Sequence, residues 1–143
     1  MHASAPAPFD PAADGWKLWP PYGFTALIGP FWTREDNGKR QFGFLAEARH
    51  DNRQGIVHGG MLMSFADSAI GMTAWEIAGR RPCVTMQMET QFLNAARGDD
   101  FVICEPELVR AAHSVIFMRG MLRTGDKPIL AVSGIWKIIQ KKA

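Results

Sequence analysis

Hydrophobic and polar positions alternate along much of the chain, with the period of a β-strand that has one buried face. Within residues 40–49, apolar side chains take every second position from Phe42 to Ala48. The Asn37-Gly38 pair just before them favours a tight hairpin turn from a preceding strand at residues 31–34. The same criteria predict four later strands, at residues 84–93, 101–109, 114–123 and 129–139. Pro106 favours a bulge or an edge position within the second of these.

One long segment departs from the strand pattern. Residues 61–78 are apolar at nearly every position and are followed by Gly79, as expected for a helix buried on all sides that ends at a glycine. Asp67 lies within it, and an ionised, unpaired carboxylate in such a helix is strongly destabilising. A single long helix among about six antiparallel strands predicts an α+β domain, in which the helix lies against one curved sheet.

The N-terminal stretch has a different composition. Six of the nine prolines lie at or before Pro30, and residues 1–15 contain five alanines without apolar periodicity. We expect residues 1–23 to form an extended or partly disordered arm, and residues 24–143 to form the domain. The segment from Trp16 to Pro30 is rich in aromatic residues, which predicts contact with the domain or with a neighbouring subunit; these residues are Trp16, Trp19, Tyr22 and Phe24.

Composition excludes several classes of protein. With 143 residues, 47% of them hydrophobic, the chain can form one core, and its net charge of +2 does not suggest a nucleic-acid partner. The two cysteines, Cys83 and Cys104, are too few for a disulfide-framed secreted scaffold. The N-terminus lacks the basic and apolar regions of a signal peptide, and the weakly charged stretch at residues 59–75 is too short to span a membrane. We therefore expect a cytoplasmic protein without a membrane partner.

The candidate chemistry lies in residues 50–76. Gly59 and Gly60 stand where the helix begins, and the first N–H groups of a helix have no intrahelical acceptor. The helix dipole adds partial positive charge at the same place, which suits a developing oxyanion. Asp67 follows Gly59 by eight residues, or about 12 Å along a helix axis. Within one chain the two groups cannot serve the same carbonyl, but across two antiparallel subunits they can. If both are catalytic, the site lies at a two-fold interface, and each dimer has two equivalent sites.

Asn52, His58-Gly59-Gly60 and Asp67, at this spacing, resemble the hotdog-fold acyl-CoA thioesterases of the phenylacetate (PaaI-type) group. The resemblance covers roughly residues 24–139 and includes the segments VTMQMETQFLNAARGDD and ILAVSGIWKII. It implies a hotdog fold, in which a curved antiparallel sheet of about five to six strands wraps around one long central helix, and an assembly of dimers or tetramers. It also implies hydrolysis of an acyl- or aryl-CoA thioester to a carboxylic acid and free CoA.

The same resemblance implies roles for five residues. The backbone N–H of Gly59 would polarise the thioester carbonyl, and Asp67 of the partner chain would act as general base on water or as nucleophile through a transient anhydride. Asn52 would orient the water or the carbonyl, His58 would hold the loop that shapes the pocket, and Thr85 would lie near the attacking water. No metal or redox cofactor is implied, and CoA counts as part of the substrate.

The resemblance also implies that loop residues bind the nucleotide end of CoA. Arginine suits phosphate because its planar guanidinium group donates two parallel hydrogen bonds. The favoured candidates are Arg110 and His113, near the closing strands, and basic residues elsewhere in predicted loops or at element ends are further candidates; these are Arg53, Arg80, Arg81 and Arg97.

Structural interpretations stay open beside these roles. Asp67 could be a buried carboxylate with its own partners, and Asn52 could simply cap its loop. The spacing of His50, Asp51, His58 and Asp67 matches no compact zinc pattern. Two other functions on the same fold also stay open. One is a non-catalytic acyl-CoA-binding module; the other is an enoyl-CoA hydratase, which the glycines after His58 disfavour.

Overall fold

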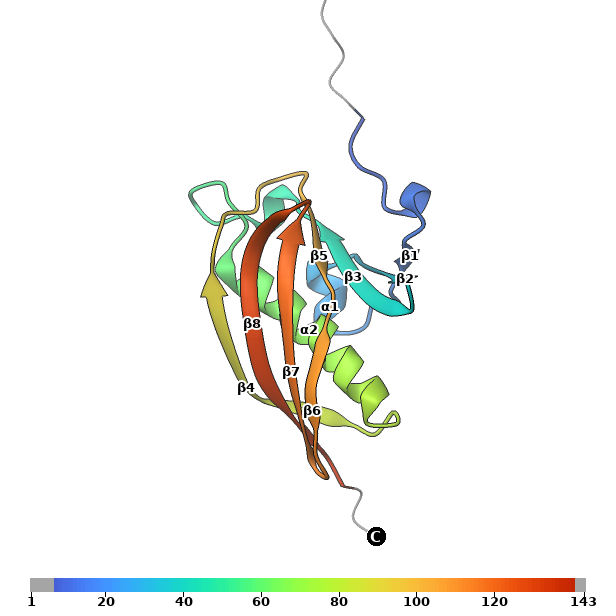
Figure 1. The fold of residues 1–143 in the computed structure, drawn as a ribbon. Helices are drawn as coiled ribbons and strands as arrows, with labels where there is room; N and C mark the ends of the chain where they lie inside the picture. The colour runs from blue at the N-terminus through green and yellow to red at the C-terminus, as the bar shows by residue number, and fades with distance from the viewer. Residues whose placement is uncertain (1–6, 141–143) are drawn as a thin grey trace, which may run out of the picture.

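The computed structural model describes residues 7–140, which form one antiparallel sheet around one long helix (Figure 1). This α+β hotdog arrangement confirms the predicted fold class. The helices are α1 (Phe24–Ile28) and α2 (Gly59–Ile77), with short 3-10 turns at Ala12–Asp14 and Ala48–His50. The strands are β1 (Lys17–Leu18), β2 (Phe31–Asp36), β3 (Lys39–Leu45), β4 (Cys83–Phe92), β5 (Phe101–Cys104), β6 (Glu107–Ala111), β7 (Val115–Thr124) and β8 (Lys127–Ile138).

The sheet has more strands than the alternation pattern predicts. Its order is β1-β2-β3-β5-β7-β8-β4, and β6 pairs with β7 beyond this path. The single strand predicted at residues 101–109 is two strands, because Pro106 between β5 and β6 has no N–H to donate to a ladder. β1 comes from the N-terminal arm and extends the sheet by pairing Leu18 with Trp32 of β2.

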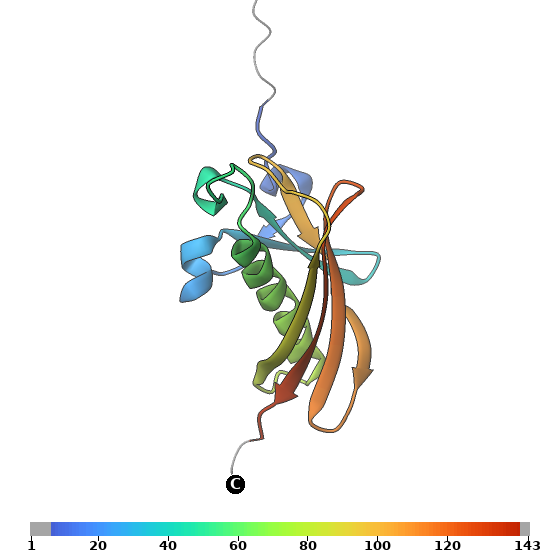
Figure 2. The same cartoon turned by 90° about the vertical axis from the view of Figure 1, so that its left-hand side faces the viewer.

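The sheet curves around α2, which passes across its concave side (Figure 2). The side chains of Phe65 and Ile70 are fully buried, and α2 ends before Gly79, whose φ of 69° is the left-handed conformation that glycine adopts without strain. The prediction that this helix is buried on all sides is wrong for the single chain. One face remains half-buried, because the curved sheet covers only the other faces; it comprises Ser64, Asp67, Ser68, Gly71 and Trp75.

The described part of the N-terminal arm packs closely against the domain. Trp16 is buried, its ring meets Phe101 edge-on with centroids 5.0 Å apart, and the Arg34 guanidinium lies 4.3 Å from its ring centre. The predicted extended or disordered character of the arm also concerns residues 1–6, which lie outside the described residues. After β1 the arm continues into α1, which lies beside the first turns of α2 (Figure 2).

β4 forms the edge of the sheet and pairs with β8 alone. It is ten residues long, mostly exposed, and interrupted by an irregularity at Met86, which is 61% exposed. Long exposed edge strands with apolar side chains tend to pair with another chain. Within residues 7–140, no helix combines the length and apolar character that crossing a membrane requires.

Candidate active site

The structure brings Asp67 of α2 and Thr85 of β4 together. The Thr85 hydroxyl donates a hydrogen bond to Oδ1 of Asp67 at 2.5 Å, a short distance typical of a hydroxyl bonded to a carboxylate. Asp67 is half-buried on the open face of α2. Its second oxygen, Oδ2, meets no donor among residues 7–140 and is available to a water molecule or a substrate atom.

Asp67 and Thr85 line a cavity of about 410 Å³ between α2, β4 and the N-terminal arm. Asp67 is the one charged residue in its lining, which is otherwise largely aromatic or apolar. A cavity with a carboxylate and no cation disfavours phosphate and suits an uncharged, mainly apolar group. Its other walls include Trp19, Trp75, Trp136, Gly71 and Met72.

The sequence-based prediction of the site did not include the tryptophan walls or Gly71. Gly71 and Trp75 follow Asp67 by one and two helical turns, so their spacing already places them on the same helix face. Trp19 of the arm and Trp136 of β8 come from distant segments, and no local pattern links them to Asp67.

Cys83 lines the same cavity. Burial raises the pKa of its thiol, and the Arg81 charge lowers that pKa by a smaller amount.

Gly59 is the first residue of α2, and its N–H has no acceptor in the described part of the chain. The ring of Phe92, at the end of β4, lies against it: a Cβ added to Gly59 would be 3.0 Å from Cε1 of that ring. Gly59 and Asn52 line a second cavity of about 320 Å³. Within one chain, the candidate oxyanion donor and the candidate base therefore lie in separate cavities, as the helix arithmetic predicts.

Asn52 holds the loop that precedes α2. Its Oδ1 accepts hydrogen bonds from the N–H groups of Gln54 and Ile56, at 2.9 and 3.4 Å, and its Nδ2 donates to the Gln54 side chain. These bonds match the structural interpretation of Asn52 as a loop cap.

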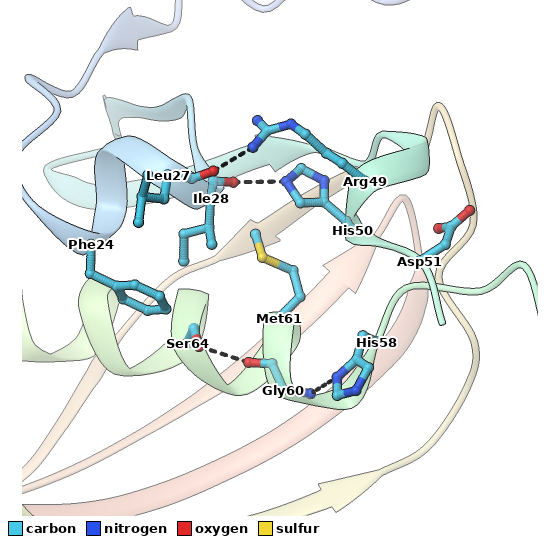
Figure 3. A pocket seen from close by; sticks show the side chains of 10 residues that line it. All are labelled: Phe24, Leu27, Ile28, Arg49, His50, Asp51, His58, Gly60, Met61 and Ser64. Atoms are coloured by element: carbon cyan, nitrogen blue, oxygen red, sulfur yellow. Dashed lines mark hydrogen bonds between the residues drawn. The ribbon is translucent and has the colours of Figure 1, made fainter. Parts of the chain in front are cut away.

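His58 is the N-cap of α2 (Figure 3). Its Nδ1 accepts a hydrogen bond from the Gly60 N–H at 2.8 Å, so the ring satisfies one of the free N–H groups of the first turn. This contact holds the loop, while the Gly59 N–H stays free. His58 lines a third cavity, of about 460 Å³, between α1 and the first turns of α2.

His50, across that third cavity, connects the loop to α1 (Figure 3). Its Nδ1 accepts from the Glu47 N–H at 3.0 Å, so Nε2 carries the proton and donates to the Ile28 carbonyl at 2.7 Å. Arg49 donates to the Leu27 carbonyl at 2.6 Å. Both nitrogens of His50 are thus hydrogen-bonded. Among residues 7–140, no group of three or more histidine, cysteine or carboxylate side chains is placed to hold a metal ion.

Four of the candidate basic residues are exposed and lie at two ends of the sheet. Arg81 precedes β4, and Arg110 and His113 lie in or beside the β6–β7 hairpin, at the end where β4 begins. Arg53 lies beside Asn52, at the end where β4 finishes. The structure therefore does not gather all four within one chain.

The sequence profile of the thioesterase superfamily matches residues 54–131, more than half of the chain. The chain belongs to the thioesterase superfamily. A Pseudomonas aeruginosa protein that carries the name of an esterase, PA0474, is 27% identical over 115 residues, which are 78% of this chain and 85% of that protein. The family resemblance seen in the sequence is thereby confirmed.

Solved structures of other proteins share the fold. Thioesterase superfamily member 2 of zebrafish has a TM-score of 0.74 at 20% identity, covering 82% of this chain and 87% of its own. The PaaI protein of the Escherichia coli phenylacetic acid degradation operon has a TM-score of 0.70 at 16% identity, covering 82% and 85%. The BH2602 protein of Bacillus halodurans, solved with CoA, has a TM-score of 0.70 at 17% identity, covering 77% and 74%.

Proposed function

We propose that this chain is an acyl-CoA thioesterase that hydrolyses an acyl- or aryl-CoA thioester to a carboxylic acid and free CoA, at sites shared by two subunits. The observation that carries the proposal is the placement of the free Gly59 N–H at one end of β4 and the Asp67–Thr85 pair at the other. Membership of the thioesterase superfamily and the CoA bound to the Bacillus halodurans protein support the choice of substrate.

In the proposed dimer, the exposed β4 edges of two subunits pair antiparallel about a two-fold axis. Such pairing satisfies the free backbone groups of both edges. It also brings the Phe92 end of one β4, with Gly59 beside it, to the Thr85 end of the other. Each dimer then has two equivalent sites, and each site combines Gly59 of one subunit with Asp67 of its partner. Dimers could pair further into tetramers.

In the reaction, the thioester carbonyl oxygen accepts a hydrogen bond from the Gly59 N–H, and the dipole of α2 stabilises the negative charge that develops there. Thr85 holds Oδ1 of Asp67 in place, which leaves Oδ2 to accept a proton from water as the water oxygen attacks the carbonyl carbon. The tetrahedral intermediate then expels the CoA thiolate, which takes up a proton. In the alternative route, Oδ2 attacks the carbonyl, CoA leaves, and water hydrolyses the resulting anhydride.

The two ends of the substrate have different requirements. The acyl group suits the aromatic cavity beside Asp67, whereas the phosphates of CoA require cations. The two-fold axis brings Arg53 of one subunit to the end where Arg81, Arg110 and His113 of its partner lie. These residues are the proposed nucleotide contacts. Asn52 and His58 shape the loop that presents Gly59, and the proposed reaction uses neither a metal nor a redox cofactor.

Subunit complementation tests the proposal. Asp67→Asn removes the base or nucleophile, and Gly59→Pro removes the N–H; each variant alone should lose hydrolysis of an acyl-CoA panel, measured by thiol release. When the two variants are co-expressed, half of the dimers are mixed, and each mixed dimer has one intact site. We expect about one quarter of the wild-type rate to return.

Co-expressed wild-type subunits, each with a different affinity tag, serve as the control for assembly and yield. Failure of the mixed dimer to regain activity, with the dimer isolated through both tags, would contradict the shared site. A wild-type protein that binds acyl-CoA but hydrolyses none of the panel would instead favour the non-catalytic binding module.

A further inference from the structure

The cavity beside Asp67 contains a polar atom that the proposed reaction does not use. Trp136 of β8 is 1% exposed, and it lines this cavity. Its indole N–H meets no acceptor within residues 7–140, although buried tryptophans usually pair this group. In the same range, one side-chain oxygen or nitrogen is both unpaired and fully shielded from solvent, and it belongs to Asp51. The unpaired Trp136 N–H is therefore not fully shielded, and it is reached from the cavity.

Gly71 of α2 leaves the space in front of this N–H open. A Cβ added to Gly71 would lie 3.3 Å from Nε1 of Trp136 and 4.0 Å from its Cδ1, so any other residue here would cover the donor. Glycine lowers the stability of a helix interior relative to alanine, so its presence in the middle of α2 has a cost in stability. The clearance that it leaves is on the same helix face as Asp67, one turn further along.

We propose that the acyl group of the substrate carries a hydrogen-bond acceptor, and that the Trp136 N–H binds it across Gly71. This inference rests on the proposed thioesterase function and specifies its substrate class. Gly71 follows Asp67 by four residues, which places the donor about 6 Å along the helix from the carboxylate that serves the reacting carbonyl. The expected substrates are acyl-CoA thioesters with a ketone, ether or hydroxyl oxygen part-way along the acyl group.

The donor lies among aromatic side chains, which explains how it would distinguish acyl groups with an acceptor from acyl groups without one. Trp19 and Trp75 line the cavity with Trp136, so an acyl group without an acceptor still finds apolar contact but leaves the N–H unpaired. An acceptor at the right position gains one hydrogen bond between neutral groups. A bond of this kind changes kcat/KM by about 3- to 10-fold.

The test compares octanoyl-CoA with 5-oxooctanoyl-CoA and 7-oxooctanoyl-CoA by thiol release. For the wild-type protein, we expect one oxo substrate to exceed octanoyl-CoA in kcat/KM by about 3- to 10-fold. In Gly71→Ala, the methyl group covers the donor, so the ratio of the oxo substrate to octanoyl-CoA should fall to about one, whatever the change in the rate with octanoyl-CoA itself. The control is Gly98→Ala, because a Cβ at Gly98 meets nothing within 4 Å; it should keep the wild-type ratio.

Binding supplies a second measurement that does not need turnover. The free acids octanoate and 5-oxooctanoate can be titrated while the indole N–H signals of the five tryptophans are followed by nuclear magnetic resonance. The oxo acid should shift the Trp136 signal, assigned through Trp136→Phe, and octanoate should not. If the wild-type protein hydrolyses none of these substrates, the thioesterase proposal alone is overturned. Equal ratios in wild type and Gly71→Ala, or an unmoved Trp136 signal with both acids bound, would overturn this inference alone.

Discussion

At the scale of single residues, surroundings decide what each polar side chain can do. One oxygen of Asp67 accepts a hydrogen bond from Thr85, and the other meets no donor among residues 7–140. His50 shows the opposite case, because both of its nitrogens are bonded to backbone groups and neither can serve as acid, base or ligand. His58 uses Nδ1 to cap α2, which agrees with a loop-holding role.

The two cysteines should differ in reactivity for the same reason. Burial raises the pKa of the Cys83 thiol, and burial with the neighbouring Glu105 raises the pKa of Cys104 to about 12. Because the thiolate is the reactive form, iodoacetamide should alkylate Cys83 more slowly near neutral pH than an ordinary cysteine, with a rate that rises with pH. Cys104 should react only after unfolding. Site-resolved mass spectrometry measures both rates, and labelling of Cys104 in the folded protein as fast as Cys83 would refute this assignment.

At the scale of elements, two neighbouring N–H groups in the first turn of α2 differ in whether they are bonded. The Gly60 N–H is taken by the ring of His58, while the Gly59 N–H has no acceptor in residues 7–140. Gly59 is the first helical position, where the N–H is free in any helix and where proline is tolerated. The preceding residue, His58, has φ −59° and ψ 135°, a conformation that is also compatible with a following proline.

These features make Gly59→Pro a specific probe of the oxyanion donor. It removes the N–H while keeping the helix start, so we expect kcat to fall by about 10²- to 10³-fold with little change in thermal stability. Gly59→Ala is the matched control, because it adds a similar contact with the Phe92 ring but keeps the N–H. Steady-state kinetics and thermal unfolding of both variants make the comparison. An equal loss in the two would indicate that crowding by Phe92, and not the N–H, is responsible.

At the scale of the whole molecule, the exposed edge of β4 organises the proposed site. Val84, Met86 and Phe92 are 46%, 61% and 54% exposed, so three apolar side chains lie open along this one strand. Pairing of two such edges would cover these side chains and unite the two half-sites. The proposed activity therefore depends on assembly.

A charge on this edge should separate the subunits and stop hydrolysis together. We expect Met86→Lys to shift the protein toward the monomer and to lower turnover in proportion, since lysine on an edge strand opposes pairing. Leu27→Lys on α1, where Leu27 is 72% exposed, is the control and should keep both assembly and activity. Light scattering after size-exclusion chromatography gives the mass. A monomeric Met86→Lys protein with full activity would contradict the shared site.

Local patterns in the sequence determined the elements and part of the chemistry. The apolar run and Gly79 predict a helix close to the observed α2, because burial and a left-handed stop act within a few residues. The strands from β2 to β8 follow from alternation and turn residues, apart from the division at Pro106, whereas the short β1 does not. If Gly59 and Asp67 act on one carbonyl, their spacing already requires two subunits, since helix rise is constant.

The tertiary structure decided which distant residues meet. Thr85 reaches Asp67 because β4 lies at the sheet edge beside α2, and Trp19 and Trp136 enter the same cavity from the arm and from β8. The open face of α2 has the same origin, because it depends on how far the sheet curves. Strand order, register and curvature arise from contacts between segments far apart in the chain, which no local pattern of residues specifies.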